Sequence, residues 1–333
     1  MTIEIVKAGL LTTVQDTGRF GFQKAGVSIG GAMDINAIQI ANVLVGNDEN
    51  EAALEVTMTG PTMQFHETTM FAITGGDLSP KLNGTHVPLN RPILAKRGDE
   101  LSFHQIKDGC RSYIAFAGGL QIKKVMNSYS TYLRAGIGGL NGRPLKKGDR
   151  LICKQRNRRS EGLYTLLTSQ KRMVAQWSVS SHLCNNTNSN CIRVIRGRHY
   201  DSFSLESVQL LWNSSYTVTT EADRMGYRLN GSPLTLKKQQ QMLSEPVSFG
   251  TIQVPGDGMP IILMADSQTV GGYPIIGQVA AVDRSKIAQM KAGDLLLFEE
   301  IDMNSAGYLF RKRQANLEKL KASIYAKWVG GGE

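Results

Sequence analysis

The chain has 333 residues and carries 38 Lys and Arg against 28 Asp and Glu, a formal net charge of +10. At roughly 100–200 residues per domain, this length predicts two domains. Hydrophobic residues make up 41% of the chain, which is enough for packed cores and excludes wholesale disorder. No apolar run reaches the length of a membrane-spanning helix, and the N-terminus lacks a signal-peptide core. We therefore expect a cytoplasmic protein with no membrane partner.

The positive charge is concentrated in the middle third of the chain. Residues 101–200 hold 18 basic and 3 acidic side chains, a net +15, whereas residues 1–100 sum to -4 and residues 201–333 to -1. Aromatic residues, which commonly accompany basic side chains in single-stranded nucleic-acid sites, do not interleave the basic cluster Lys154–Arg159. We expect no nucleic-acid partner, and favour a solvated linker or a surface for an acidic partner.

Short strands dominate the first 155 residues. The helix expected among them is Asp34–Val45, where apolar residues recur at helical spacing behind Asp34. The pair Asn83-Gly84 predicts a two-residue hairpin turn. We place an N-terminal β domain at residues 1–155. Its strand-like runs are Ile3–Val6, Leu54–Met58, Met70–Ile73, Leu101–Ile106, Ser112–Phe116 and Leu151–Lys154.

A basic and then polar segment, residues 156–190, is interpreted as a linker or insertion with one helix at Tyr164–Gln176. Strand-like runs resume behind it and predict a C-terminal β-barrel domain at residues 191–300. A helical tail, residues 301–333, is predicted by a stripe of Leu317, Leu320 and Ile324. The runs of the second domain are Ile192–Arg196, Tyr216–Val218, Ile252–Val254, Ile261–Met264 and Leu295–Phe298.

Several local patterns complete this outline. Asn230-Gly231 predicts a second hairpin turn, and Arg284–Met290 a short helix. A Gly-Asp pair followed by a strand-like run occurs three times, beginning at Gly98, Gly148 and Gly293, and each predicts a turn that leads into a strand. Strands without a βαβ rhythm favour a mainly β fold with closed or sandwiched antiparallel sheets.

Four sequence patterns resemble functional motifs but lack the flanking sequence or spacing that those motifs require. Gly26–Gly30 matches Gly-x-Ser-x-Gly, but no buried strand precedes it, which argues against a serine hydrolase. Gly136–Gly142 is a near miss to a dinucleotide loop and is interpreted as a mobile glycine loop. Met290-Lys291 lacks the hairpin setting of a biotinylated lysine, so we expect no biotin on this chain. The four cysteines form no CxxC pair, and we expect idle thiols and no metal.

Two blocks of polar residues carry candidate chemistry in the N-terminal part. Gln15, Asp16 and Arg19 combine an amide, an acid and a guanidinium, and Gly30-Gly31 lead into the helix behind Asp34. A helix start presents free N–H groups that suit an anion. A turn salt bridge and a simple N-cap explain the same residues equally well.

Two further blocks lie in the C-terminal part. Glu221–Arg228 gathers two acids and two arginines around a glycine. Farther on, the apolar strand Ile261–Met264 ends at Asp266, where a carboxylate is well placed to act as a general base. Polar residues and a Gly-Gly pair follow it, a combination that lets backbone approach a ligand. These following residues are Gln268, Thr269, Gly271, Gly272 and Tyr273.

Taken in series, these blocks resemble the KipA-like family, also called the 5-oxoprolinase C-subunit or biotin-dependent carboxyltransferase (allophanate hydrolase subunit 2-like) family. The resemblance implies two cyclophilin-like β-barrel domains with few helices and a C-terminal helix. It also implies that the chain works in a complex with the two other subunits of 5-oxoprolinase. These are a smaller, KipI-like B subunit and the A subunit. The matching segments are Gly9–Arg19, Gly26–Asp34, Ala41–Gly46, Leu54-Glu55, Gly75-Gly76, Gly118-Gly119, Ser128–Thr131, Arg224–Leu229, Glu245–Pro255 and Asp266–Pro274.

The reaction implied by the resemblance opens 5-oxo-L-proline to L-glutamate with ATP hydrolysis. Such a site needs cations and N–H donors for phosphate and a carboxylate that positions water. We assign phosphate-side roles to Arg19, Arg224 and the Gly30-Gly31 helix start, and Asp266 or Asp16 as the base. The residues expected to bind substrate are Gln15, Gly30, Gly31, Met33, Asp34, Glu55, Arg228, Gln253, Gln268, Thr269, Gly271, Gly272 and Tyr273.

Two alternatives stay open. One is carboxyl transfer from carboxybiotin, held on a separate carrier, to a urea-like or amide substrate. The other is a non-catalytic antagonist that binds a KipI-like histidine-kinase inhibitor through the basic middle third. In that case, charge reversal at Arg156, Arg158 and Arg159 abolishes the pairing.

Overall fold

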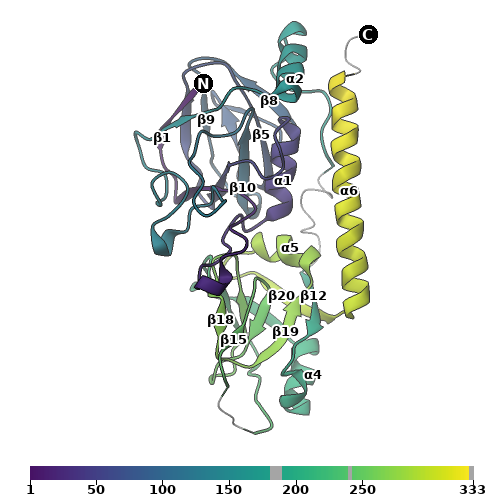
Figure 1. The fold of residues 1–333 in the computed structure, drawn as a ribbon. Helices are drawn as coiled ribbons and strands as arrows, with labels where there is room; N and C mark the ends of the chain where they lie inside the picture. The colour runs from purple at the N-terminus through teal and green to yellow at the C-terminus, as the bar shows by residue number, and fades with distance from the viewer. Residues whose placement is uncertain (181–189, 239–241, 330–333) are drawn as a thin grey trace. The chain divides into compact units, whose positions relative to one another are not determined.

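The computed structural model describes residues 1–180, 190–238 and 242–329, without the side chains of 328 and 329. Cys184 and part of the expected linker lie outside this range. The chain divides into two compact units: the first comprises residues 1–19, 34–186 and 315–333, and the second residues 20–33 and 187–314. Residues 20–33 thus group with the second unit, although the sequence placed them in the range 1–155. Figure 1 labels the elements along the chain.

Two sheets form the framework of the first unit. The first sheet runs in the order β11 (Arg150–Ile152), β1 (Thr2–Lys7), β4 (Thr62–Phe65), β9 (Glu100–Ser102), β6 (Lys81–Leu82) and β7 (Thr85–His86). The second runs in the order β2 (Leu11–Gln15), β3 (Ala53–Thr57), β10 (Asp108–Phe116), β5 (Thr69–Asp77) and β8 (Pro92–Ala95). The strand pairs with defined register in both sheets are antiparallel.

A shared apolar core lies between the inner faces of these two sheets. Phe65 of β4 and Phe71 of β5 stack with ring centroids 5.5 Å apart. In the second sheet, Val14, Leu54 and Ile114 are register partners on neighbouring strands, and all three are buried in this core. Because side chains alternate across a strand, their sequence neighbours face the other side.

That other side is covered by α1 (Ile35–Leu44), which packs on β3, β5 and β10. Asp34 caps the helix, because its carboxylate accepts a hydrogen bond of 3.0 Å from the N–H of Ala37. The Thr74 hydroxyl of β5 donates to the carbonyl of Ala37 at 2.7 Å. The helix predicted at Asp34–Val45 is confirmed, and its first turn is fastened to the sheet.

Two further helices of the first unit, α2 and part of α6, come from later segments of the chain. α2 (Arg158–Ser169) begins six residues before the helix expected at Tyr164–Gln176, because Asn157 supplies an N-cap that accepts from two backbone N–H groups. α6 (Met303–Val329) is continuous, and its residues from 315 onward belong to this unit. Its Leu317 and Ile324 are buried and its Lys321 pairs with Glu49, so this part of the helix packs on the rest of the first unit.

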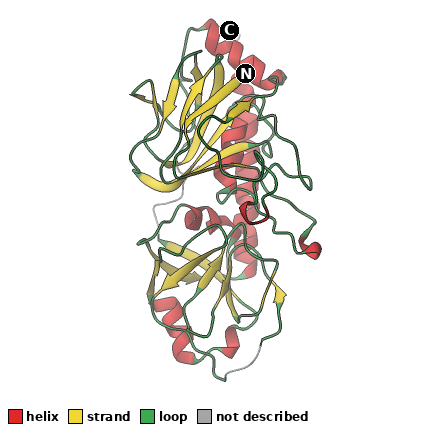
Figure 2. Ribbon diagram, turned by 90° about the vertical axis from the view of Figure 1, so that its left-hand side faces the viewer, coloured by secondary structure: helices red, strands yellow, loops and turns green. Residues whose placement is uncertain are grey.

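The second unit contains a closed barrel whose strands, within the described residues, follow the order β12, β19, β16, β17, β14, β13 and β20. Figure 2 draws the strands of both units in yellow. Neighbouring strands are antiparallel except at the closing pair of β12 and β20, which is parallel. The bounds are β12 (Cys191–Arg196), β13 (Ser215–Val218), β14 (Gly226–Asn230), β16 (Thr251–Gln253), β17 (Ile261–Leu263), β19 (Ile275–Val279) and β20 (Leu295–Glu300).

Smaller elements surround this barrel. They are α4 (Leu205–Asn213), α5 (Arg284–Ala288) and the two-stranded sheet of β15 (Glu245–Pro246) and β18 (Val270–Gly271). Short 3-10 turns of this unit are η1 (Gln23–Ala25), η3 (Tyr200–Ser202) and η4 (Ala281–Asp283), whereas η2 (Leu133–Ala135) belongs to the first unit. The barrel interior is filled by aromatic and aliphatic side chains such as Tyr216, Tyr227, Ile262 and Phe298.

The mainly β class, the closed barrel and the C-terminal helix are confirmed by this arrangement. In the first unit the strands form two hydrogen-bonded sheets. The hairpin at Asn83-Gly84 is also confirmed, because both residues have positive φ between β6 and β7. The second predicted hairpin is wrong, since β14 pairs with β13 and β17 and neither strand follows it directly. In the described residues, no helix is both long and apolar enough to cross a membrane.

Candidate functional site

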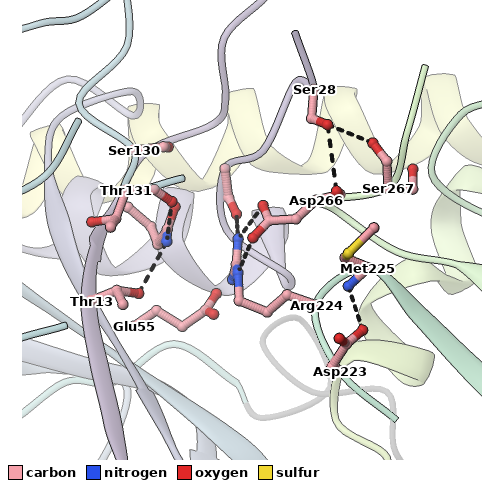
Figure 3. Close-up of polar contacts among 12 residues, drawn as sticks. Thr13, Ser28, Glu55, Ser130, Thr131, Asp223, Arg224, Met225, Asp266 and Ser267 are labelled. Atoms are coloured by element: carbon pink, nitrogen blue, oxygen red, sulfur yellow. Dashed lines mark hydrogen bonds and ion pairs between the residues drawn. The ribbon is translucent and has the colours of Figure 1, made fainter. Parts of the chain in front are cut away.

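Arg224 and Asp266 form the central ion pair of the second unit. The guanidinium meets the carboxylate side-on, with Nε 2.8 Å from Oδ2 and Nη2 3.0 Å from Oδ1 (Figure 3). Nη2 also donates to the carbonyl of Gly31 at 2.5 Å. Both side chains are buried. Since Arg224 engages both oxygens of Asp266, this carboxylate is held as an ion-pair partner.

The loop that contains Gly31 is fastened to the segment that carries Asp266. Ser28 Oγ donates to the carbonyl of Ser267 at 2.7 Å (Figure 3). The N–H of Gly30 donates to the carbonyl of Ala265 at 3.1 Å. Ser28 is the central residue of the Gly-x-Ser-x-Gly pattern. Its hydroxyl therefore has a structural partner, which agrees with the rejection of a hydrolase elbow.

Four more predicted residues, Gln253, Gly271, Gly272 and Tyr273, lie at strand ends of the second unit. The buried Gln253 donates from Nε2 to the carbonyl of Tyr273 at 3.4 Å. A Cβ at Gly271 would lie 2.5 Å from that nitrogen, so glycine is needed there for close approach. Gly272 and Tyr273 line an open pocket of about 560 Å³, whose other walls include Phe203 and Leu234.

The other predicted substrate residues of this unit lie elsewhere. Arg228 points out of the barrel from β14, is exposed, and pairs with Glu221 at 3.0 Å. Met33 is fully buried in the apolar core of the unit. Gln268 and Thr269 are half-buried in the loop after Asp266. The alternation along β14 explains the position of Arg228, because Tyr227 and Leu229 on either side of it face inward.

In the first unit, Asp16 organises a distant loop. Its carboxylate accepts from Ser128 Oγ at 2.7 Å, from the N–H of Tyr129 at 2.6 Å and from the N–H of Gly18 at 2.8 Å. Ser130 Oγ donates to the same carboxylate and accepts from the backbone N–H of Asp16. Both oxygens of Asp16 thus accept hydrogen bonds, Oδ1 from Ser128, Ser130 and Gly18 and Oδ2 from the N–H of Tyr129.

Arg19 is buried beneath the same loop. Its Nε donates to the carbonyl of Val125 at 3.2 Å, and its Nη2 to the carbonyl of Ser130 at 2.7 Å. The glycine loop packs against it, because a Cβ at Gly138 would lie 2.9 Å from Nη2 and closer still to Ser130. These glycines therefore serve close packing, a role that the expectation of a mobile loop did not include.

Gln15 lies fully buried beside this cluster. Its Nε2 donates to Thr13 Oγ1 at 3.0 Å and to the carbonyl of Thr131 at 3.2 Å. A carbonyl oxygen can only accept, which fixes the nitrogen of the amide on that side. Among the described residues, no donor lies within hydrogen-bonding distance of Oε1. The protein therefore orients the amide, and its buried acceptor oxygen has no hydrogen-bond donor among the described residues.

A polar row crosses the second sheet beneath α1. Thr13, Glu55, Tyr113 and Thr74 are successive register partners on β2, β3, β10 and β5. The Tyr113 hydroxyl donates to Glu55 Oε2 at 2.8 Å and accepts from the N–H of Asp34 at 2.8 Å. Burial, and then the charges of Glu55 and Asp34, raise the pKa of Tyr113 well above its usual value. Tyr113 therefore stays protonated and fixes Glu55.

Chemically, the clusters described above contain hydrogen-bond acceptors, carboxylates and side-chain amides of fixed orientation. In the described part of the chain, no group of three His, Cys, Asp or Glu side chains is arranged to hold a metal ion. Cys110 and Cys153 are buried, and burial raises the pKa of Cys153 to about 12, so its thiol is unreactive near neutrality.

The sequence missed Tyr113, Ser128 and Ser130 as members of the site. Tyr113 is identified only by the strand register, which sets it opposite Glu55. Ser128 and Ser130 lie more than a hundred residues from Asp16, so no local spacing connects them. The run Ser128–Thr131 is one of the segments that carry the family resemblance, and this was the available signal.

A mainly β chain with a closed barrel and buried carboxylate and amide clusters agrees with the carboxyltransferase-domain class of proteins. The chain belongs to the family described as "Carboxyltransferase domain, subdomain A and B", whose sequence profile matches residues 25–300.

Within that family, the chain is similar to the C subunit of 5-oxoprolinase from Escherichia coli, with 37% identity over 96% of this chain and 97% of the relative. It is also similar to the urea amidolyase of Saccharomyces cerevisiae, with 32% identity over 96% of this chain but 18% of the relative. The crystal structure of the K. lactis urea amidolyase matches 96% of this chain with a TM-score of 0.86 and 28% identity. This chain spans about a fifth of that protein, covering 20% of it.

Proposed function

We propose that the chain is the C subunit of an ATP-dependent 5-oxoprolinase, which opens 5-oxo-L-proline to L-glutamate together with the A and B subunits. The observation that carries this proposal is the match to a 5-oxoprolinase C subunit over 97% of that protein's length. The urea amidolyase relative is matched over only 18% of its length, so most of that protein has no counterpart in this chain.

The chemistry of a lactam agrees with the polar clusters. An amide is a poor electrophile, and transfer of a phosphoryl group from ATP to its oxygen would create a leaving group. The ring N–H of a lactam needs an acceptor, which Gln15 Oε1 provides in a dry environment. We assign the substrate's N–H to Gln15 and a buried acidic environment to Glu55, which Tyr113 holds in place.

The roles of the two aspartates and two arginines follow from their contacts. Asp16 and Asp266 each have both oxygens engaged, and Arg19 and Arg224 donate to main-chain carbonyls or to Asp266. We therefore propose that each of these four residues positions the loops of its own unit and does not exchange protons with the substrate.

The test mixes the purified A, B and C subunits with ATP and 5-oxo-L-proline and measures glutamate and phosphate. We expect both products only when all three proteins are present. Controls omit each of the three in turn. If the A and B pair alone produces glutamate as fast as the full set, the proposal for this chain is wrong.

Carboxyl transfer to a urea-like or amide substrate is the second candidate. It is favoured by the description of the family and by the fold shared with the K. lactis urea amidolyase. This reaction requires carboxybiotin on a separate carrier. It predicts that the chain, with carboxybiotin and urea, releases biotin and a carboxylated product without the A and B subunits, which the first candidate does not.

A further inference from the structure

Met126 of the first unit combines a strained backbone with an exposed apolar side chain. Outside glycine, positive φ in the described residues is found most often at asparagine, whose short polar side chain tolerates it. Met126 has a φ of 51° and is 40% exposed. Such a conformation is unfavourable for an L-residue, because its Cβ comes too close to the following carbonyl oxygen. The presence of methionine at this position therefore needs a reason.

The turn that contains Met126 does not supply that reason. Met126 and Asn127 are its two central residues, and Val125 and Ser128 flank them as antiparallel partners. The N–H of Val125 donates to the carbonyl of Ser128 at 2.8 Å. Two-residue turns of this kind need positive φ at both central positions and favour asparagine and glycine there. Asn127, with a φ of 63°, satisfies this preference, whereas Met126 does not.

Packing inside the first unit does not supply it either. Ile122 and Tyr129, on either side of the turn, pack against the apolar core of the unit. Met126 is not among the described side chains that form or contact that core. A residue that keeps a strained conformation without an internal gain points to a function outside the chain's own packing.

The turn is held firmly at its base. The carbonyl of Val125 accepts from Arg19 Nε at 3.2 Å, and Ser128 Oγ donates to Asp16 Oδ1 at 2.7 Å. Arg19, Asp16 and Ser128 are all buried. Met126 is thus presented on a turn whose two ends are fixed to the interior of the unit. A group that is ordered before binding loses little conformational freedom when a partner binds it.

The surroundings of Met126 in the chain are positively charged. Lys123 and Lys124 lie just before the turn, are exposed, and make no ion pair within the part of the chain that the structure describes. Lys124 Nζ lies 4.8 Å from the centroid of the Tyr129 ring, on the other side of the turn. The sequence from residue 109 to residue 148 contains no Asp or Glu. A group that docks here should therefore carry negative charge around an apolar centre.

We propose that Met126, flanked by Lys123 and Lys124, docks into an apolar pocket of a partner protein whose border carries carboxylates. Methionine is unbranched and polarizable, adapts to irregular pockets and is enriched at protein interfaces. Small molecules bind in concave pockets rather than on an exposed turn, and membrane-surface helices bury a whole apolar face, so a protein fits best. Only the identity of this partner, the A or B subunit, rests on the proposed function.

The experiment measures dissociation constants of the full chain with the purified A and B subunits, each alone and both together, by calorimetry. Met126→Gly should weaken binding of at least one subunit about tenfold or more, as expected for an anchor residue. It should unfold at the same temperature as wild type or higher, because glycine accepts a positive φ without strain. The matched control Asn127→Gly changes the other central residue, keeps Met126, and should bind within about twofold of wild type.

A second pair of changes tests the charges. Replacing Lys123 and Lys124 together by glutamine should slow association, and more so at low than at high salt, because charged borders mainly steer encounter. An association rate equal to that of wild type at low salt would remove the acidic border from the proposal.

Three results would overturn the docking of Met126. Met126→Gly that binds both subunits as tightly as wild type would do so while leaving the proposed function intact. Equal losses in Met126→Gly and Asn127→Gly would assign the effect to the shape of the turn. Unfolding of Met126→Gly several degrees below wild type would show that Met126 has an internal packing role. A wild-type chain that binds neither subunit would contradict the docking and the proposed function together.

Discussion

Gln15 illustrates how single buried residues acquire a defined role in this fold. Its amide nitrogen is held by Thr13 and Thr131, and the whole side chain is inaccessible to solvent. A buried acceptor without a donor costs free energy, and a ligand N–H that reached Oε1 would recover this cost. The same reasoning favours structural roles for Asp16 and Asp266, because their carboxylate oxygens already accept hydrogen bonds from the protein.

Replacing Gln15 tests that role. Gln15→Ala should raise the KM for 5-oxo-L-proline about three- to tenfold in the reconstituted complex, with a smaller effect on kcat, because one hydrogen bond to the substrate is worth about 0.5–1.5 kcal/mol. Initial rates over a range of substrate concentrations measure this. Gln121→Ala, at an exposed position, is the matched control and should behave as wild type. Identical KM values for both variants would remove Gln15 from the substrate site.

Asp283 carries a pH-dependent part of the stability. Burial alone would raise its pKa, but the hydrogen bonds from Arg193 and the charge of Lys286 outweigh burial and hold it below the usual range. A depressed folded-state pKa contributes stability that is fully present above the unfolded value, near 3.9, and is lost as the pH falls through the folded value.

Asp283→Asn should therefore lower the free energy of unfolding at pH 7 by about 3 kcal/mol, because it leaves two cations without their buried partner. The difference from wild type should shrink as the pH falls below about 4, where wild type loses the same interaction. Urea unfolding at several pH values measures both effects. Asp257→Asn, an exposed acid without an ion pair in the described residues, is the control. A difference that is constant with pH would contradict the ion-pair explanation.

The sequence predicted most residue types of the site but not their partners. Gln15, Asp16, Arg19, Arg224 and Asp266, selected from the sequence as candidate site residues, are all buried in the structure. Nothing in their spacing indicates that Arg224 and Asp266, which lie 42 positions apart, neutralise each other. Exposed Arg228 was selected because charge and proximity in sequence do not reveal on which face of a strand a residue lies.

At the scale of elements, the three Gly-Asp turns share one geometry. In each turn the aspartate carboxylate accepts from the backbone N–H three residues earlier, at 2.7 Å for Asp99, 2.8 Å for Asp149 and 2.9 Å for Asp294. The preceding glycine has a positive φ each time, between 86° and 89°. A strand follows directly, so this local pattern was predictable from the sequence alone.

Asn157 fastens α2 to the end of α1. Its Oδ1 accepts from the N–H groups of Arg159 and Ser160 at 3.0 and 2.9 Å, while its Nδ2 donates to the carbonyl of Gly46 at 2.8 Å. One side chain thus caps one helix and satisfies the residue that ends another. The cap explains why α2 begins earlier than its apolar pattern indicated.

Asn157→Ala should destabilise the first turn of α2 by about 1 kcal/mol or more, because it removes both the cap and the bond to Gly46. Hydrogen exchange of the Arg159 and Ser160 amides measures this locally. Asn157→Asp keeps the cap and loses only the bond to Gly46, so it should protect these amides better than alanine does. Equal exchange in wild type and Asn157→Ala would show that the cap contributes nothing.

Elements defined by local signals were predictable, and those defined by pairing were not. The pair Asn83-Gly84 forms its hairpin because the flanking segments pair with each other. Asn230-Gly231 carries the same signal, but Leu229 and Asn230 pair with β13, which lies earlier in the chain. Closure of the barrel by a parallel pair has no local signature either.

At the scale of the whole molecule, the basic middle third contains two kinds of arginine. Some bind other side chains of the protein, and others are exposed without an ion pair in the described residues. Arg156 binds Glu161 at 2.6 Å, and Arg159 donates to the Tyr325 hydroxyl at 2.8 Å. Arg158 between them is exposed and makes no ion pair within the described residues. A docking surface for an acidic partner would therefore depend on exposed basic residues without an internal ion pair, such as Arg158, and less on Arg156 and Arg159, which have partners within the chain.

Arg158→Glu should leave the unfolding temperature unchanged or slightly higher, because a negative charge suits the first turn of a helix. Arg156→Glu and Arg159→Glu should lower it, since they oppose Glu161 and break the bond to Tyr325. If this face binds an acidic partner protein, Arg158→Glu should also weaken co-purification with the KipI-like B subunit, more at low than at high salt. Unchanged co-purification at low salt would exclude this face as the surface that binds the B subunit.

The division of the chain also constrains its biosynthesis. Residues 20–33 are made early but belong to the second unit, and residues 315–333 of the first unit leave the ribosome only after the whole second unit. Neither unit can therefore be completed by a nascent chain that folds strictly from its first residue onward. The early segment must wait for its partners, which makes this protein a candidate for chaperone assistance during translation and a poor one for expression as separate halves.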